Sequence, residues 1–152
     1  LCEMPNLEGL WIKWSSINSI ESLSKLRRLR FLHVGQSGRL KSISPIASMP
    51  TLKWLSIVDV RAAYDLTPLS RLGGLDGLAI EGGYGRPLAV RTLAPIAVLT
   101  DLRFLSIINL KSQDKTLAPL FPLSNLERFL CAAWWSAAEH SELRRRNPGL
   151  SK

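Results

Sequence analysis

The sequence predicts an α/β repeat solenoid, in which a curved parallel β-sheet forms the concave face and short helical or 3₁₀ turns form the convex face. Two observations predict this fold. A strand motif built on leucine recurs six times along the 152 residues, and a second apolar motif precedes each of the last five copies at a constant offset. Self-similarity at a fixed period of roughly 20–50 residues is typical of repeat architectures.

The first half of each repeat has the residue spacing of a β-strand. It reads Leu-x-x-Leu-x-Ile or a close variant, and successive copies begin 22, 23, 23, 27 and 24 residues apart. Its last two apolar residues alternate with polar or exposed positions, which is the pattern of a strand with one buried face. The copies begin at Leu7, Leu29, Leu52, Leu75, Leu102 and, in degenerate form, Leu126.

The second half of each repeat predicts a short helical or 3₁₀ turn. Its apolar residues are three apart, and in four of the five copies a proline stands where a helical turn would begin. Proline is tolerated there because the first turn does not use the missing N–H. Two residues separate this motif from the next leucine, so the variation in length falls in the loop after the strand. The copies span 20–26, 43–49, 66–72, 93–99 and 117–123.

A strand, a loop and a short turn in about 23 residues resemble the unit of the leucine-rich repeat family, over about residues 1–132. The turn motif is most similar to the short-period repeats of internalin-type and bacterial proteins. The family usually has Asn or Cys at the ninth repeat position, which here holds Ser15, Ser37, Val60, Gly83 and Leu110. We therefore expect the convex loops to be less regular than in the type members of the family.

The segment 133–152 predicts a C-terminal cap, because a terminal repeat has apolar surface with no neighbour. Ser136 and Glu139 have the spacing of a capping box, which predicts a helix over 137–146 with both side chains bonded at its first turn. The arginine run 144–146 would lie at the C-terminus of this helix, where the helix dipole favours positive charge. The residues expected to cover the open end of the stack are Trp134 and Trp135.

The N-terminus has no such cap. Leu1 and Met4 continue the spacing of the repeats, so the sequence opens in the middle of a repeat, and its first residue is not methionine. These observations favour the hypothesis that the sequence is the C-terminal part, or a processed fragment, of a longer protein.

The composition excludes several classes of protein. With 46% hydrophobic residues the chain is too apolar for wholesale disorder, and its two cysteines cannot staple a disulfide-rich scaffold. Arg or Lys interrupts every long apolar stretch, so we expect no membrane-spanning helix, and no signal peptide is recognisable. We predict a cytoplasmic, reducing compartment, with a secreted effector as an alternative.

No catalytic or metal-binding constellation is expected. His33 is predicted on a strand and His140 in the cap helix, so the two lack the paired spacing of zinc ligands. Cys131 takes the place of an inward isoleucine and is expected to be a small buried hydrophobe, while His140 is expected in solvent. The segment 81–87 is glycine-rich but lacks the Gly-Lys-Ser/Thr ending of a phosphate-binding loop, which predicts a flexible loop or a contact loop. We predict no enzyme, no cofactor and no metal.

The distribution of basic residues indicates which kind of partner the protein could bind. A net charge of +8 invites a nucleic-acid partner, but most of the basic residues are dispersed and predict a solvated surface. The second repeat position is more informative, because it places Arg30 and Lys53 on adjacent strands about 4.8 Å apart. Such a basic spot suits acidic groups of a protein partner, or phosphates. Nucleic acid is the less favoured partner, and no small-molecule substrate is indicated.

The outward columns of the sheet predict the binding surface. If the fourth and sixth repeat positions point inward, the third, fifth and seventh point to the concave face. The third column holds three aromatic residues, and aromatic and arginine side chains dominate interface hot spots. We therefore predict a non-catalytic module that recognises a protein partner. The candidate residues are Trp11, Lys13, Arg30, Phe31, His33, Lys53, Trp54, Arg103, Phe104 and Ile108.

Two alternatives stay open for the aromatic residues. The rings can stack on one another across strands and only stiffen the sheet, or a further segment of a parent protein can cover them. Three settings also stay open for a recognition module. They are the sensor region of a larger signalling or nucleotide-hydrolysing switch protein, a toxin-neutralising binder, and the targeting module of a secreted effector.

Overall fold

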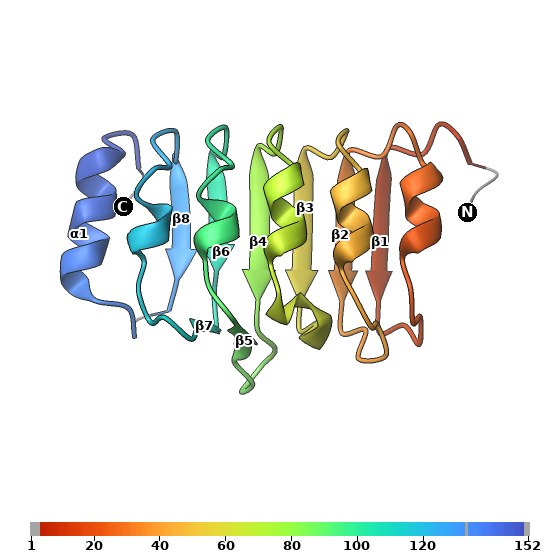
Figure 1. The fold of residues 1–152 in the computed structure, drawn as a ribbon, viewed down its shortest axis with the longest axis horizontal. Helices are drawn as coiled ribbons and strands as arrows, with labels where there is room; N and C mark the ends of the chain where they lie inside the picture. The colour runs from red at the N-terminus through yellow and green to blue at the C-terminus, as the bar shows by residue number, and fades with distance from the viewer. Residues whose placement is uncertain (1–3, 133, 151–152) are drawn as a thin grey trace.

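Six parallel strands form one sheet in the computed structural model, which describes residues 4–132 and 134–150 (Figure 1). Each strand comes from a different copy of the strand motif, in sequence order. The strands are β1 (Gly9–Lys13), β2 (Phe31–Gly35), β3 (Trp54–Val58), β4 (Gly77–Glu81), β6 (Phe104–Ile107) and β8 (Arg128–Cys131). The α/β solenoid predicted from the sequence is confirmed, while the expectation for Leu1 lies outside the described residues.

Neighbouring strands pair with equivalent repeat positions side by side. Leu32 lies beside Leu10 in the β1–β2 pair and beside Leu55 in the β2–β3 pair. The same register continues to Leu78 and Leu105. The side chains of the fourth repeat position therefore form one column. From Leu32 to Leu105 each of them is buried, so this position points into the core.

Short 3₁₀ turns cover the other side of the solenoid (Figure 1). Four of them have proline in their first turn, as the sequence predicts. An additional turn, η3, lies in the loop after β3. The turns are η1 (Glu21–Lys25), η2 (Ser44–Ser48), η3 (Arg61–Tyr64), η4 (Thr67–Arg71), η5 (Ala94–Ile96) and η6 (Ala118–Leu120).

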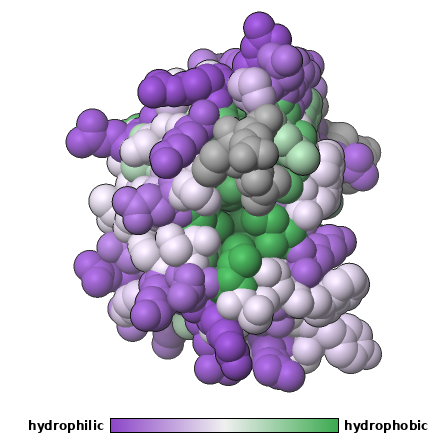
Figure 2. Space-filling model, turned by 90° about the vertical axis from the view of Figure 1, so that its right-hand side faces the viewer, coloured by the Kyte–Doolittle hydropathy of each residue, from purple (hydrophilic) through white to green (hydrophobic). Residues whose placement is uncertain are grey.

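One hydrophobic core runs along the solenoid between the sheet and the turns. At the C-terminal end, Trp135 and Leu143 complete it, and both side chains are buried. Trp134, which was also expected to cover this end, is 48% exposed. At the N-terminal end, Leu7 is half-buried whereas the equivalent Leu29 of the next repeat is buried. Figure 2 shows apolar side chains gathered at that end of the molecule.

A polar side chain caps the first backbone N–H of each of five turns. Ser19 Oγ accepts a hydrogen bond from Glu21 N, and Ser42 Oγ accepts one from Ser44 N. Asp65, Thr92 and Thr116 do the same for the later turns. Such bonds satisfy donors that a short helix leaves without a partner. The capping residue lies directly before each turn motif, and the sequence analysis did not identify it.

Helix α1 (Ala137–Arg146) follows the last repeat, at the residues predicted for the cap helix. The predicted capping box is wrong, because Ser136 makes no side-chain hydrogen bond to the helix. The Glu139 carboxylate instead accepts hydrogen bonds from Thr116 Oγ1 and Leu117 N of the last repeat. The neighbouring repeat offers Glu139 two donors, so this side chain attaches the helix to the solenoid.

The longest repeat forms a loop that is anchored at both ends, and at its start Gly82 N donates to Ile108 O. Leu88 N donates to Asn109 O, and β5 (Leu88–Val90) then pairs in parallel with β7 (Leu110–Ser112) as a second, two-stranded sheet. At the tip of the loop, Tyr84 is fully exposed. The loop is therefore fixed at both ends and projects at its tip.

Replacement of Leu55 or Leu78 with Ala is expected to lower the free energy of unfolding by roughly 2–5 kcal/mol, because both side chains are fully buried in central strands. Each repeat stacks only on its neighbours, so the loss should spread into adjacent repeats. Urea denaturation followed by circular dichroism measures the change. The control is Ser48→Ala on the exposed side of η2, which should cost less than about 0.5 kcal/mol. Losses under about 1 kcal/mol at both leucines would contradict their inward assignment.

Candidate functional site

The candidate residues fall into two groups on the sheet side of the solenoid. Seven lie on or beside the first three strands, and three lie on or beside β6. The first group is Trp11, Lys13, Arg30, Phe31, His33, Lys53 and Trp54, and the second is Arg103, Phe104 and Ile108. Because β4 separates the two groups, any contact between them has to cross that strand.

Trp54 and Phe104 make this contact as a stacked pair. Their ring centroids lie 4.9 Å apart, at an interplanar angle of 30°. The Trp54 ring lies over Gly77 of β4, where an added Cβ would be 2.2 Å from Trp54 Cε3. Both rings are half-buried as a result. For this pair, cross-strand stacking describes the geometry, as in the alternative left open by the sequence.

Trp11 and Phe31 are the open part of the concave face. Their exposed fractions are 66% and 43%. The two strands place Gly9 beside Phe31, and the Trp11 ring folds back toward the same point. A Cβ added to Gly9 would lie 2.8 Å from Trp11 Cζ3 and 3.9 Å from Phe31 Cβ. The two side chains therefore form one accessible aromatic surface at the N-terminal end of the sheet.

Polar side chains occupy the centre of the concave face. His33 Nδ1 lies 3.0 Å from Ser56 Oγ on the adjacent strand. Burial lowers the pKa of His33, the positive charge of Lys13 lowers it further, and Glu81 acts in the opposite direction. A histidine with a lowered pKa is neutral at pH 7.

Glu81 does not complete a catalytic triad with this histidine. Its carboxylate accepts a hydrogen bond from Ser106 Oγ, whereas a triad needs the carboxylate on the histidine that activates the serine. Ser106 and Ala79 belong to the outward fifth column, yet both are buried. Their small side chains lie among larger neighbours, which for Ser106 include Glu81. The centre of the concave face is therefore a polar surface whose side chains bond to one another, His33 to Ser56 and Ser106 to Glu81.

The basic residues at the start of the strands, which we call the basic rim, are Arg30, Lys53 and Arg103, and acidic side chains neutralise some of them. Lys53 Nζ donates to Gly74 O at 2.9 Å and lies 3.9 Å from an Asp76 carboxylate oxygen. Arg103 pairs with Glu127 at 2.6 Å. Arg30 has no ion pair among the described residues. A groove of about 450 Å³ at this rim is lined by Glu8, Arg27, Arg28, Arg30, Pro50, Thr51 and Lys53.

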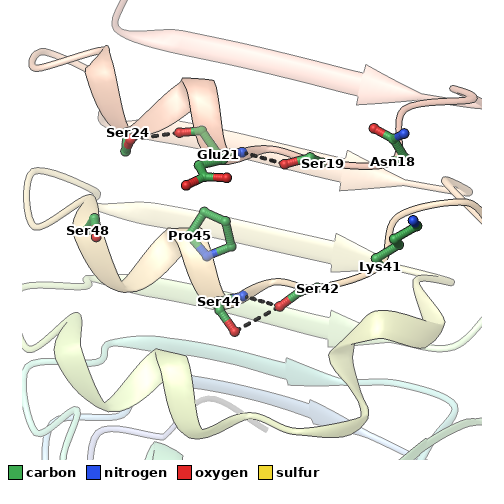
Figure 3. Close-up of a pocket in the computed structure, with 9 residues that line it drawn as sticks. All are labelled: Asn18, Ser19, Glu21, Ser24, Lys41, Ser42, Ser44, Pro45 and Ser48. Atoms are coloured by element: carbon green, nitrogen blue, oxygen red, sulfur yellow. Dashed lines mark hydrogen bonds between the residues drawn. The ribbon is translucent and has the colours of Figure 1, made fainter.

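A second groove, of about 500 Å³, lies on the convex side between η1 and η2 (Figure 3). Serine side chains line much of it, but Ser19 and Ser42 already cap the two turns. Ser24 Oγ donates to Glu21 O, and Ser42 Oγ donates to Ser44 Oγ. The hydroxyl groups of these four serines therefore stabilise the two turns that border the groove.

Cys131 and His140 lie in contact at the C-terminal end of the solenoid, between β8 and α1. Cys131 Sγ is 3.5 Å from His140 Nε2, and Ile108, which is 42% exposed, borders the same pocket. Both sequence expectations need correction, because His140 is half-buried and Cys131 is only half-buried at the last strand. Burial raises the pKa of Cys131 to about 11, against the opposing charge of Arg144. The thiol is therefore protonated at neutral pH, whereas the thiolate is the reactive form.

Two kinds of binding chemistry meet on the concave face, namely apolar contact at the rings and hydrogen bonding or charge pairing beside them. Within residues 4–132 and 134–150, no three His, Cys, Asp or Glu side chains are placed to hold a metal ion. In the same residues, no helix is long and apolar enough to cross a membrane.

The polar roles of two sets of residues were not predicted from the sequence. Glu81 is the only acidic residue in the outward columns, and this could have marked its bond with Ser106. Ser112 and Trp135 line a pocket beside β7. No local pattern joins them, because Ser112 belongs to a repeat and Trp135 to the C-terminal cap.

Solved structures of bacterial proteins resemble this fold. Internalin C2 of Listeria monocytogenes has 27% sequence identity and a TM-score of 0.73, over 98% of this chain and 61% of that one. Another internalin of the same species has 19% identity and a TM-score of 0.57, over 93% and 46%. A leucine-rich repeat protein of Leptospira interrogans has 16% identity and a TM-score of 0.57, over 99% and 49%.

These likenesses confirm the predicted resemblance to internalin-like leucine-rich repeats. The second and third, at their lower identities, show the fold alone. The chain spans about three fifths of the length of internalin C2 and about half of the other two. Comparisons with protein-family models and with curated protein sequences found no match.

Replacement of Gly77 with Ala is expected to destabilise the protein by about 1–3 kcal/mol, because the new Cβ would displace the Trp54 ring from Phe104. Thermal unfolding measures the change, and near-UV circular dichroism reports the loss of the stacked pair. The matched control is Gly73→Ala, where an added Cβ meets no atom within 4 Å. Equal stability of the two variants would show that the ring does not depend on the glycine.

Proposed function

Because the fold resembles that of internalin-like leucine-rich repeat proteins, we propose that the chain is a non-catalytic recognition module that binds another protein through its concave sheet face. Solenoids of stacked repeats present extended concave surfaces that bind macromolecules. The observation that carries the proposal is the aromatic surface of Trp11 and Phe31.

This surface has the composition of an interface hot spot. Trp11 and Phe31 are exposed side by side, and Arg30 and Lys13 adjoin them in the sequence. Aromatic and arginine side chains contribute most of the binding energy at protein interfaces. His33, neutral and half-buried on β2, borders the surface without adding charge.

The stacked pair on β3 and β6 has a different role in this proposal. Trp54 and Phe104 shield the centre of the sheet, so they support the face and present only part of their surface to a partner. Arg103, in its ion pair with Glu127, and Ile108 extend the surface toward the C-terminal end.

The rim groove favours a second candidate, an anionic partner such as nucleic acid or an acidic surface. Arg27, Arg28, Arg30 and Lys53 line this groove against a single carboxylate, that of Glu8. Binding to nucleic acid would weaken steeply with salt, because it releases counterions. An apolar protein contact depends much less on salt, so a salt titration separates the two candidates.

The cytoplasmic location of the protein stays a prediction from the sequence.

The double variant Trp11→Ala/Phe31→Ala is expected to lose affinity for the partner by about 30-fold or more, because hot-spot truncations cost at least about 2 kcal/mol. The partner is first identified as a protein retained by the immobilised wild-type chain from extracts of the source cells. Isothermal calorimetry then measures its affinity for each variant, and thermal unfolding measures stability.

Tyr84→Ala is the matched control, because Tyr84 is a fully exposed aromatic residue away from the concave face. It should bind the partner as the wild type does. Unchanged affinity of the double variant, together with a lower unfolding midpoint, would assign Trp11 and Phe31 a structural role and overturn the proposal.

A further inference from the structure

The rim groove adjoins the aromatic surface of Trp11 and Phe31. Arg30, which lines the groove, directly precedes Phe31 at the start of β2. The backbone N–H groups of Arg30 and Phe31 both donate to Glu8 O, just before β1, and these bonds fix the backbone between the groove and the rings. A protein that covers the two rings therefore lies next to the groove.

The second repeat position shows which basic side chain of the rim is available to a partner. Lys53 and Arg103 each pair with the acidic residue at the same position of the next repeat. Arg30 has Glu8 as its acidic neighbour, and their backbones are hydrogen-bonded. Their side chains nevertheless form no ion pair in the part of the chain that the structure describes. The guanidinium group of Arg30 is therefore available to an anionic group outside the chain.

Two further arginines line the same groove. Arg27 and Arg28 are exposed in the loop before β2, and neither forms an ion pair with another described residue. Thr51 Oγ1 donates to Leu29 O at 2.9 Å, which ties the loop before β3 to the loop before β2. With Arg30, these residues give the groove three guanidinium groups against one carboxylate. The excess positive charge therefore lies on a backbone that is held in place.

The surroundings of the groove favour a short acidic segment over a long polyanion. The carboxylate of Glu8 lies on one side of the basic residues and that of Asp76 on the other. Duplex DNA carries one negative charge per about 1.7 Å of its axis, so its backbone would run past both carboxylates. Lys53 Nζ is held toward the next repeat by Gly74 O, which spreads the positive charges along the rim. Acidic side chains at alternate positions of an extended peptide lie about 6.8 Å apart on one side, so their charges are spread as well.

We propose that the rim groove binds an acidic segment of a protein, with Asp or Glu carboxylates paired to the guanidinium groups of Arg27, Arg28 and Arg30. A guanidinium group can donate two parallel hydrogen bonds to one carboxylate, which gives such a pair its geometric specificity. Because the proposal rests on the proposed function, the segment belongs to the protein that covers Trp11 and Phe31. That partner therefore combines an apolar contact with neighbouring carboxylates.

The test follows the backbone amide signals of the ¹⁵N-labelled chain by NMR during titration with the peptide acetyl-Glu-Gly-Glu-Gly-Glu-amide. The salt concentration is about 50 mM, because screening weakens such contacts at higher salt. The acidic peptide is expected to shift the signals of residues 27–30 and 51–53 with saturation. The neutral peptide acetyl-Gln-Gly-Gln-Gly-Gln-amide is expected to leave them unchanged.

The double variant Arg28→Gln/Arg30→Gln, which we call the groove variant, is expected to bind the acidic peptide about tenfold more weakly, because it loses two charge-assisted contacts. The matched control is Arg39→Gln/Arg71→Gln. It loses the same net charge at exposed positions outside the groove, so it should bind nearly as the wild type does. Thermal unfolding shows that each variant is folded before it is titrated.

The variant Trp11→Ala/Phe31→Ala separates the groove from the aromatic surface. The acidic peptide carries no apolar side chain, so this variant is expected to bind it as the wild type does. Retained binding of the protein partner by this variant would count against the aromatic surface, whereas retained binding of the peptide by the groove variant would count against the groove. Each proposal therefore fails by its own measurement.

Three results would overturn the proposal for the groove. The first is the absence of a saturable shift at residues 27–30 and 51–53. The second is a groove variant that binds the acidic peptide no more weakly than its control, which would mean that only the net charge matters. The third is an oligonucleotide of twelve thymidines that binds at least about tenfold tighter than one of four, with the gain lost in the groove variant, which would identify nucleic acid as the ligand.

Discussion

Each strand of the sheet pairs with its neighbour at the same repeat position, and this register determines which side chains of the sheet form columns. The leucines from Leu32 to Leu105 form one buried column because of it. A slip by one residue would turn that column to solvent, so burial of the leucines selects the register. Full burial of one leucine contributes about 1.5–3 kcal/mol, and the column repeats this contribution from strand to strand.

Because of the same register, the aromatic rings on the two halves of the concave face differ in exposure. Gly77 lies between Trp54 and Phe104 in the third column, so these rings meet across it and cover the sheet. Trp11 and Phe31 lie at the other end of the face and remain exposed. Gly77 thus lets one pair of rings cover the sheet, while the pair at the N-terminal end stays accessible to a partner.

The sequence predicts the features that repeat and misses those that depend on a single distant neighbour. The strands and the proline-led turns follow from local spacing, and the inward leucines follow from strand alternation. The capping box at Ser136 and Glu139 fails because another repeat supplies donors to the carboxylate. The stacking of Trp54 on Phe104 depends on a glycine in the intervening strand, and no period in the sequence encodes it.

Hydroxyl-radical footprinting of the chain, free and bound to its partner, tests most directly whether the open half of the concave face is the binding surface. Binding is predicted to reduce oxidation of Trp11 and Phe31 and to leave the exposed Tyr64 and Tyr84 unchanged. Protection of Tyr64 or Tyr84 with undiminished oxidation of Trp11 and Phe31 would place the partner elsewhere and contradict the account.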